Sequence, residues 1–312
     1  MHFLYIMKMR LSLCCQSVDL HEQGTRFRTM TVTQFKKKPL HESLDVLCHR
    51  IIENFVTLKA TVDLCKSMNL AGLRIGSDLI PVINHPDLHL DFYKLPMQDE
   101  MMHAINEAKK AMKQSGLRFS AHPSEFISLT SDNPKVVANS IRDLIAHALV
   151  FELLDLPESY EAPFNIHIRK DGDPELIYQN VVRSLKQCPA CVTKRLVFEN
   201  NDNKKGVWSV KNLVSYFHVR EGVPITYDNL HHEMLSDGLT HRQAFEAAHA
   251  TWPGAVPIFH YSEGINGTRK HADYAQSLPA DYGMPVVWEV ELKAKDRAIK
   301  RIQKQLLQGS KA

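Results

Sequence analysis

The sequence predicts a single-domain (β/α)8 TIM barrel of the α/β class, and two observations favour this fold. Short apolar segments alternate with longer amphipathic segments along almost the whole chain, which is the pattern of parallel strands joined by helices. With 312 residues and 44% hydrophobic content, the chain can also bury the core of a barrel, which takes about 250 residues. We assign residues 9–312 to one barrel domain and residues 1–8 to an N-terminal extension.

Several short segments have the composition of buried strands. In chain order they are Met9–Cys15, Leu73–Gly76, Leu117–Ala121, Phe164–Ile168, Leu196–Glu199, Pro224–Tyr227, Val256–His260 and Val286–Val290. Eight strands favour closure into a barrel over an open doubly wound sheet. The GxGxxG motif of dinucleotide-binding sheets does not follow the first strand, which also favours the barrel.

The segments between the strands have helical periodicity. Asn133-Pro134 and Asp173-Pro174 are capping residues followed by a first-turn proline, a common start of a helix. The predicted helices are His41–Met68, Asp99–Gln114, Pro134–Leu154, Pro174–Gln187, Ser209–Val219, His241–Ala250, a weak one near Asp273, and Ala294–Leu307.

The composition indicates an intracellular protein. Six cysteines in a chain of this length are too few for a disulfide framework. Cys188 and Cys191 form a CxxC motif, but no second motif follows at zinc-ribbon spacing, so we expect free thiols. No apolar run approaches the ~20 residues that cross a bilayer, and the first residues lack the features of a signal peptide. We expect a cytoplasmic monomer with no membrane partner and no obligate protein partner.

Histidines and carboxylates stand at the ends of all predicted strands from the third to the eighth. In a parallel barrel, these ends and the loops after them form the active face. A single histidine there is more commonly a hydrogen-bonded structural residue, whereas a convergent set predicts a multinuclear metal site. Because no thiol belongs to the set, we expect a hydrolytic site rather than structural zinc. The candidate ligands are His122, His167, Glu199, Asp228, His231, His260, His271 and Glu291.

Basic residues follow the same strand ends, although the net charge is only +3 with His neutral. Each one alone is more commonly a surface cation, but together they would place positive charge where a phosphate backbone lies. Neighbouring divalent cations are a usual means of hydrolysing a phosphodiester. The candidate contacts to such a backbone are Arg169, Lys170, Lys204, Lys205, Arg269 and Lys270.

At these positions the sequence resembles the UV damage endonuclease family, in order from about residue 9 to residue 300. The matching motifs are jointly specific. They are Leu73–Pro81 leading to His85-Pro86, then Ser120–Pro123, Phe198–Asn200, Tyr227–His232, Phe259–Ser262, Lys270–Tyr274 and Glu291–Asp296.

The resemblance implies a DNA repair endonuclease that nicks damaged double-stranded DNA 5′ to cyclobutane dimers and 6-4 products, by attack of a metal-activated hydroxide. It implies a trinuclear site of divalent cations, with Mn²⁺ first and Zn²⁺ or Mg²⁺ as other candidates. Glu199 and His85 are the implied catalytic residues. Carried over by motif, one cation takes His122, His167 and a bridging Glu199; a second shares Glu199 and adds Asp228, His260 and Glu291; a third takes His231 and His271.

The positions that read the lesion depart from the family pattern. Glu125 and Phe126 stand after the third strand, where members often have Gln and Tyr that probe the gap left by a flipped lesion. Leu13 and Ser17 stand where members have Tyr and Asn, and Ile258 replaces a modified lysine found in some members. We therefore expect the lesion preference to differ more than the chemistry.

Three other functions fit parts of this pattern. An apurinic-site endonuclease on the same barrel would share the metals but cut at abasic sites. A metal-dependent sugar isomerase also uses His, Asp and Glu, but predicts few basic residues around a closed pocket. A barrel that only binds damaged DNA would not need the complete ligand set.

Overall fold

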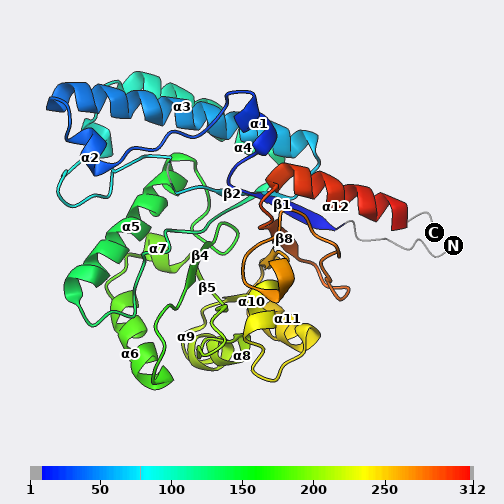
Figure 1. The fold of residues 1–312 in the computed structure, drawn as a ribbon. Coiled ribbons are helices and arrows are strands. Elements are labelled where there is room, and N and C mark those ends of the chain that lie inside the picture. The colour runs from blue at the N-terminus through cyan, green and yellow to red at the C-terminus, as the bar shows by residue number, and fades with distance from the viewer. Residues whose placement is uncertain (1–8, 78, 310–312) are drawn as a thin grey trace.

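The structure is a computed structural model that describes residues 9–77 and 79–309. The predicted extension, residues 1–8, and Asp78 of the first family motif lie outside the described residues. Figure 1 shows the strands at the centre of the molecule and the helices around them. Within the described ranges, eight strands pair in the order β6-β5-β4-β3-β2-β1-β8-β7, all in parallel. The strands are β1 Arg10–Cys14, β2 Gly72–Ile75, β3 Arg118–Ala121, β4 Phe164–His167, β5 Leu196–Glu199, β6 Ile225–Thr226, β7 Ile258–Tyr261 and β8 Val287–Val290.

The barrel closes between β6 and β7. A parallel bridge joins Asp228 to His260, and the amide of His260 donates a hydrogen bond to the carbonyl of Tyr227 at 3.0 Å. Every strand lies where the sequence predicted it, with ends that differ by at most two residues. The predicted (β/α)8 barrel is confirmed, and its closure brings two candidate ligands side by side.

Helices cover the outside of the barrel, and two of them begin at the predicted capping residues. Asn133 accepts from the amide of Lys135 at 2.9 Å, and Asp173 accepts from the amide of Glu175 at 2.9 Å. The α-helices are α1 Val18–Glu22, α2 Val32–Phe35, α3 Leu40–Ser67, α4 Gln98–Ser115, α5 Pro134–Leu153, α6 Pro174–Leu185, α7 Ala190–Thr193, α8 Val210–Leu213, α9 Val219–Glu221, α10 Asn229–Met234, α11 His241–His249 and α12 Lys295–Gly309. Short turns of other helix types are η1 Phe92–Lys94, η2 Val214–His218 and η3 Ile265–Gly267.

The predicted helix near Asp273 is wrong, because this segment pairs with its neighbours instead of with itself. The amide of Ala272 donates to the carbonyl of Glu263 at 2.8 Å, and the amide of Lys293 donates to the carbonyl of Ala272 at 3.0 Å. These tertiary bonds take the place of the i to i−4 bonds of a helix. The predicted helix at residues 209–219 is present but broken into α8 and α9 by the π-helical turn η2.

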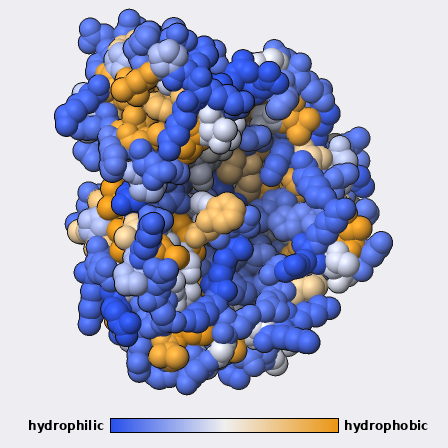
Figure 2. Space-filling view, turned by 60° about the vertical axis from the view of Figure 1, so that its left-hand side comes forward, coloured by the Kyte–Doolittle hydropathy of each residue, from blue (hydrophilic) through white to orange (hydrophobic). Residues whose placement is uncertain are grey.

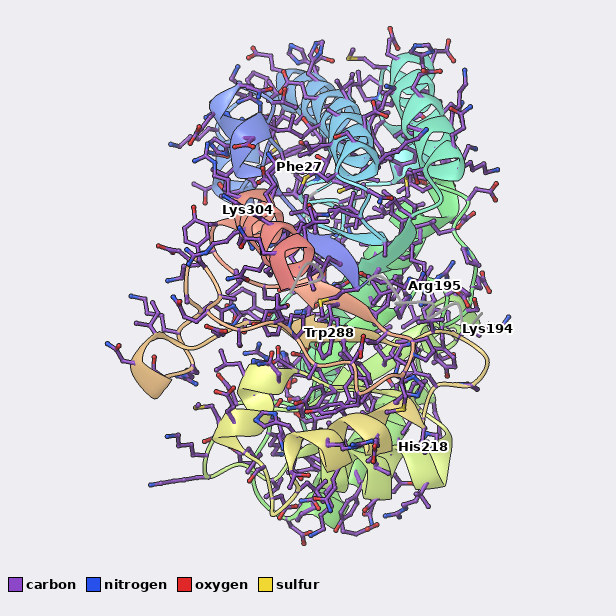
Figure 3. The ribbon with its side chains drawn as sticks, turned by 90° about the vertical axis from the view of Figure 1, so that its right-hand side faces the viewer. Phe27, Lys194, Arg195, His218, Trp288 and Lys304 are labelled. Carbon is purple, nitrogen blue, oxygen red and sulfur yellow. The ribbon has the colours of Figure 1, made fainter. Side chains whose placement is uncertain are left out.

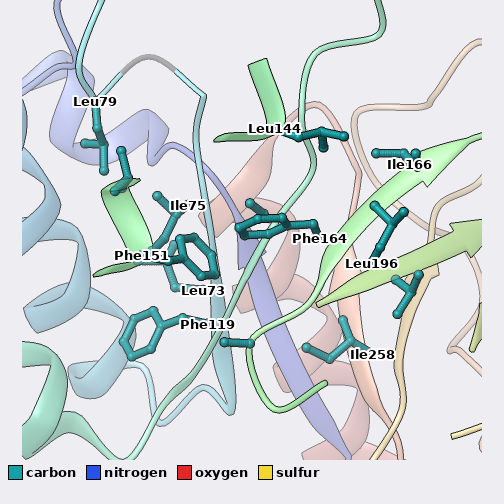
Figure 4. Packing of buried hydrophobic residues seen from close by; sticks show 14 of the residues in the cluster. Leu73, Ile75, Leu79, Phe119, Leu144, Phe151, Phe164, Ile166, Leu196 and Ile258 are labelled. Carbon is teal, nitrogen blue, oxygen red and sulfur yellow. The ribbon is translucent and has the colours of Figure 1, made fainter. Parts of the chain in front are cut away.

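The layer between the strands and the surrounding helices is apolar, whereas the interior of the barrel is polar at the carboxyl ends of the strands. Between the wall and the helices, Phe151 and Phe164 pack edge to face with ring centroids 4.8 Å apart (Figure 4). Trp288 of β8 is 1% exposed and lies among the strands in Figure 3. The strands also bury the polar residues Ser120, Asn165, Glu199, Thr226, His260 and Glu289. Polar groups buried in this way need partners, so this end of the barrel is the place to look for a site.

The structure also bears on two expectations from composition. Among the described residues, no helix is long and apolar enough to cross a membrane. The cysteines, Cys188 and Cys191 included, are free, and burial raises the pKa of Cys188 to about 11. Cys188 is therefore a thiol at neutral pH, in line with the free thiol predicted for it.

Candidate metal centre

Glu199 ends β5, and histidines from several strands converge on its carboxylate. Its Oε2 lies 3.1 Å from Nε2 of His122 and 3.5 Å from Nε2 of His167. Its Oε1 lies 3.0 Å from Nδ1 of His260 and 3.2 Å from Nδ1 of His231. Glu199 is 1% exposed, so these interactions are shielded from water. The structure thus brings together candidate ligands that are far apart in the sequence.

Oxygen acceptors fix the orientation of most of these rings. Four of the candidate ligands donate from Nδ1: His122 to the carbonyl of Pro123 (3.2 Å), His167 to Oδ1 of Asn201 (3.1 Å), His231 to the carbonyl of Asn200 (2.8 Å) and His271 to the carbonyl of Glu291 (2.7 Å). A ring that donates from Nδ1 carries its lone pair on Nε2, and a neutral ring held in this way is a common metal ligand. These histidines are oriented as ligands.

Among the buried polar atoms beside Glu199, Oδ2 of Asp228 and Nδ1 of His260 have no hydrogen-bond partner within the described residues. Nδ1 of His260 is close to Glu199, but not in hydrogen-bond geometry. Leaving such atoms unpaired costs about 1–3 kcal/mol each, and coordination of a cation would remove that cost. Ligand atoms of Glu199, Asp228 and His260 lie within 4.8 Å of one another, as do those of His122, His167 and Glu199. The residues therefore fit two cation sites that share Glu199.

The pKa values of Glu199 and His167 match this interpretation. Burial opposes the ionisation of Glu199, but His167 and His260 hold the pKa of its carboxyl well below the usual value. Burial lowers the pKa of His167 to about 3. Burial also lowers the pKa of His260, yet the Glu199 carboxylate outweighs it and raises that pKa to about 10. An ionised Glu199 and a neutral His167 are in the protonation states that metal binding requires.

A second polar layer lies directly beneath the ligands, and the sequence analysis did not identify it. Three of its members each stand two positions before a candidate ligand, so the two side chains of each pair point into the barrel. Asn165 donates to Oε2 of Glu199, and Ser120 donates to Glu289. The stacked pairs are Ser120 with His122, Asn165 with His167, and Glu289 with Glu291. The alternation of polar residues at i and i+2 in three strands was the signal that could have revealed this layer.

Arg74 of β2 completes the second layer. Its Nε donates to Oε2 of Glu289 at 2.5 Å, and its Nη1 lies 2.5 Å from Oε1 of Glu291. Burial opposes the ionisation of Glu289, but Arg74 outweighs it and lowers the pKa of that carboxyl to about 2. Arg74 is 7% exposed. A buried guanidinium therefore balances part of the negative charge of the centre.

The other predicted site residues have contacts of their own. Asp228 caps α10 by accepting from the amide of His231 at 2.8 Å. Nε2 of His271 lies 4.0 Å from Oε2 of Glu291. His85 is in the loop after β2, where its Nδ1 accepts a backbone hydrogen bond at 3.3 Å. In the part of the chain that the structure describes, none of His85, His231, His271 and Glu291 joins the two ligand groups around Glu199.

Comparison with known proteins shows the family. The family model described as UV-endonuclease UvdE matches residues 9–311. The chain belongs to the UV-endonuclease UvdE family. A UV DNA damage endonuclease of Nostoc sp. is 29% identical over 308 residues, covering 96% of this chain and 91% of the relative. Another, of Bacillus pumilus, is 28% identical over 321 residues, covering 98% and 97%. The crystal structure of SacUVDE shares the fold, with a TM-score of 0.80 and 23% identity over 98% of this chain and 100% of that chain.

In this UvdE-family chain, a groove of about 650 Å³ opens beside the ligand cluster, with His167 and His231 in its lining. Ion pairs lie along its rim: Nη1 of Arg169 is 3.5 Å from Oε2 of Glu125, and Nη1 of Arg269 is 3.6 Å from Oδ2 of Asp202. Lys170 pairs with Asp132 at 2.7 Å, while Lys204, Lys205 and Lys270 are exposed. Figure 2 shows a hollowed face of the molecule, bordered mainly by hydrophilic side chains. The predicted basic residues thus stand on exposed loops after the strand ends.

The predicted lesion contacts divide into exposed and buried positions. Phe126 is 85% exposed, on the loop after β3 that also carries Glu125. Leu13 is 0% exposed and belongs to the hydrophobic core, so the structure does not support its predicted contact with DNA. Ser17 is also buried and caps α1 by accepting from the amide of Leu20 at 3.1 Å. Leu13 therefore serves the core, and Ser17 serves the start of α1.

Proposed function

We propose that this chain is a DNA repair endonuclease that nicks the phosphodiester backbone 5′ to UV photoproducts, both cyclobutane dimers and 6-4 products. Membership of the UvdE family supports the substrate. The observation that carries the chemistry is the shared carboxylate of Glu199, which takes part in two groups of ligand atoms. Neighbouring cation sites bridged by one carboxylate are typical of enzymes that hydrolyse phosphodiesters.

The ligand assignment follows the contacts around Glu199. His122, His167 and Glu199 would hold one divalent cation. Glu199, Asp228, His260 and Glu291 would hold a second. His231 and His271, whose Nε2 lone pairs are set by their Nδ1 hydrogen bonds, are proposed for a third. We propose Mn²⁺ as the ion, because imidazole and carboxylate ligands without thiols suit it, as they also suit Zn²⁺ or Mg²⁺.

When bound, such cations would lower the pKa of a water molecule and offset negative charge on the phosphate. The chain's own residues supply the geometry. Asn165 donates to Glu199 and so holds the plane of the bridging carboxylate. His85, on the loop after β2, is proposed to contact the scissile phosphate. Arg169 and Arg269, at the rim of the groove, are proposed to hold the flanking phosphates.

Selection of damaged DNA would depend on the loop after β3. A photodimer stacks and pairs poorly, so extruding it from the duplex costs less than extruding normal bases. Phe126, 85% exposed, could fill the resulting gap by stacking on the remaining bases. Lys170, Lys204, Lys205 and Lys270 would add attraction to the backbone without reading sequence.

The direct test uses supercoiled plasmid. Purified protein with Mn²⁺ is expected to nick UV-irradiated plasmid and to leave unirradiated plasmid intact. Glu199→Gln should abolish nicking, whereas Glu221→Gln, which changes a carboxylate that binds Tyr178 far from the centre, should not. Equal nicking of both plasmids would contradict the proposal.

Oligonucleotides carrying one lesion each separate the remaining functions. Incision beside a photodimer supports the proposal, while incision only at an abasic site would make the chain an apurinic-site endonuclease on the same barrel. The exposed cations around the groove argue against a sugar isomerase, which binds a small neutral substrate in a closed pocket.

A further inference from the structure

His260 is oriented differently from the other candidate ligands. His122, His167, His231 and His271 donate from Nδ1 to oxygen acceptors and leave Nε2 for a cation. His260 instead turns Nδ1 toward Glu199 and Glu291, at 3.0 and 3.5 Å. Its Nε2 points down to the second layer, where Oε2 of Glu289 lies at 3.3 Å and Nη2 of Arg74 at 2.9 Å.

We propose that Glu289, held in place by Arg74 and Ser120, is the positioning residue that makes His260 a metal ligand. This inference rests on the cation site of the proposed function and adds a residue to it. A ring that offers the Nδ1 lone pair to a cation must carry its hydrogen on Nε2. Glu289 accepts that hydrogen, in the arrangement of carboxylate, histidine and metal that fixes a ligand's tautomer and increases its basicity.

Arg74 cannot take over this role. A guanidinium has only donors, so it can bind Nε2 of His260 only when Nε2 carries no hydrogen. The hydrogen would then sit on Nδ1 and block coordination. Arg74 and Glu289 therefore select opposite tautomers of the same ring. Coordination of a cation through Nδ1 of His260 therefore requires that Nε2 bind Glu289 rather than Arg74.

The surroundings of Glu289 are built to hold its carboxylate still. Arg74 donates from Nε to Oε2 at 2.5 Å, and Ser120 donates to Oε1. Glu289 and His260 are each 1% exposed. Buried charges that lose one partner destabilise a protein strongly, so Arg74 is needed even though it does not accept from the ring. Its second contact, to Glu291 at 2.5 Å, ties another candidate ligand to the same support.

Two roles of Glu289 predict different effects of substitution on metal binding. In one role Glu289 only forms a buried ion pair with Arg74, and in the other it positions His260. Glu289→Gln and Glu289→Met both remove the charge that faces Arg74. Gln keeps an oxygen that can accept from Nε2, whereas Met of similar size has none. Positioning therefore predicts that Gln retains more metal affinity than Met, while a charge role alone predicts equal losses.

The first experiment measures binding of Mn²⁺ by calorimetry, with bound metal counted by mass spectrometry. We expect Glu289→Met to weaken one Mn²⁺ site by about 10- to 100-fold and Glu289→Gln to weaken it less. Equal weakening, or no weakening, would overturn the inference. Wild-type protein that binds Mn²⁺ but cuts no DNA would refute the proposed function and leave the inference open to the same comparison of variants.

Arg74→Lys tests the support, and Arg195→Lys is its matched control. Arg195 is also a buried arginine, at 2% exposure, but it stands before β5 at the opposite end of the barrel (Figure 3). It donates to the carbonyls of Leu156, Pro157 and Cys191. We expect Arg74→Lys to weaken Mn²⁺ binding several-fold more than Arg195→Lys does. Equal Mn²⁺ affinity in the two variants would contradict the role given to Arg74.

A spectroscopic measurement on the wild-type protein avoids the question of whether a variant folds. In the Zn²⁺-loaded protein labelled with ¹⁵N at histidine, long-range proton–nitrogen spectra report which ring nitrogen carries hydrogen. We expect the hydrogen on Nε2 of His260 and on Nδ1 of His122 and His167. Hydrogen on Nδ1 of His260 would overturn the inference.

Discussion

The ligand cluster and the rim of the groove differ in how firmly their charges are held. In the cluster, Glu199 is 1% exposed and takes its contacts from several strands. At the rim, the paired side chains Arg169 and Glu125 are 45% and 65% exposed and lie 3.5 Å apart. An exposed pair of this kind contributes about 0–1 kcal/mol, whereas removing one partner of a buried pair costs about 3–5 kcal/mol.

This difference separates the chemistry from the recognition of the substrate. The buried cluster has little freedom, because each side chain is fixed by the strand that carries it and by the layer beneath. The rim residues are on loops, and their carboxylate partners can be exchanged for phosphates at low cost. Changes in the cluster should therefore alter the chemical step, and changes at the rim should alter the affinity for DNA and the choice of lesion.

Glu199→Gln should have the largest effect, and it tests whether the cluster and the rim have separate roles. Loss of a bridging carboxylate should lower the rate of nicking by on the order of 1,000-fold or more. Affinity for UV-damaged DNA should change little, since the rim is intact. Single-turnover nicking and fluorescence anisotropy measure the two quantities. A variant that loses DNA affinity as strongly as nicking would show that the cluster and the rim are not separable.

Phe126→Ala should act in the opposite way, on discrimination rather than on chemistry. An aromatic ring stacked on bases contributes about 1–3 kcal/mol, so we expect the preference for damaged over undamaged DNA to fall about tenfold. Val219, an exposed apolar residue that precedes β6 at the other end of the barrel, offers the control Val219→Ala. Competition binding with damaged and undamaged duplexes gives the ratio, and an unchanged ratio would rule out a probing role for Phe126.

The buried cluster should also determine how the stability of the protein depends on pH when EDTA keeps metal ions away. His167 has a pKa of about 3 in the folded protein and an ordinary value of 6.5 when unfolded. Its contribution to the free energy of unfolding is therefore present above pH 6.5 and is lost as the pH falls toward 3. His260 has a raised pKa of about 10, so its contribution is present below pH 6.5 and is lost as pH rises through 10. We therefore expect maximum stability near pH 6.5.

Denaturant titrations across pH test this expectation. Each group changes the unfolding free energy by about 1.4 kcal/mol per pH unit over its range. His167→Gln should flatten the acid side between pH 6.5 and 4.5 and leave the alkaline side unchanged. An acid side as steep in the variant as in the wild type would assign the effect to other groups.

The position of a residue in the barrel decides whether its role could be predicted from the sequence. Strand ends in a parallel barrel lie on one face, so His122, Glu199 and Asp228 could be grouped from their order alone. Asn165 and Glu289 were missed because a polar residue inside a strand reveals its partner only once the barrel closes. Arg74 lies in a family motif, but its partners on β8 are more than 200 positions away in the sequence.

Wrong predictions arose where local pattern and tertiary environment disagreed. Leu13 and Ser12 are adjacent in β1, yet both are buried, because a barrel strand is covered on both faces. The predicted DNA contact of Leu13 rested on the resemblance to the family, and alternation in β1 could not show that Leu13 faces the core. The segment around Asp273 has helical periodicity, but hydrogen bonds to Glu263 and Lys293 hold it in a loop.

The ion pairs at the rim could not be predicted from the sequence either, because they depend on the conformations of loops. The prediction with the smallest expected effect concerns one of these pairs. Glu125→Gln removes a carboxylate that competes with phosphate for Arg169. We expect affinity for DNA to rise about two- to threefold at low salt, and the gain to disappear at high salt. Glu158→Gln is the matched control, because Glu158 pairs with Lys194 at 3.4 Å with similar exposure, and Lys194 precedes β5 at the far end of the barrel (Figure 3). Equal gains in both variants would show that only net charge matters, whereas a gain confined to Glu125→Gln would show that Arg169 exchanges its carboxylate for DNA.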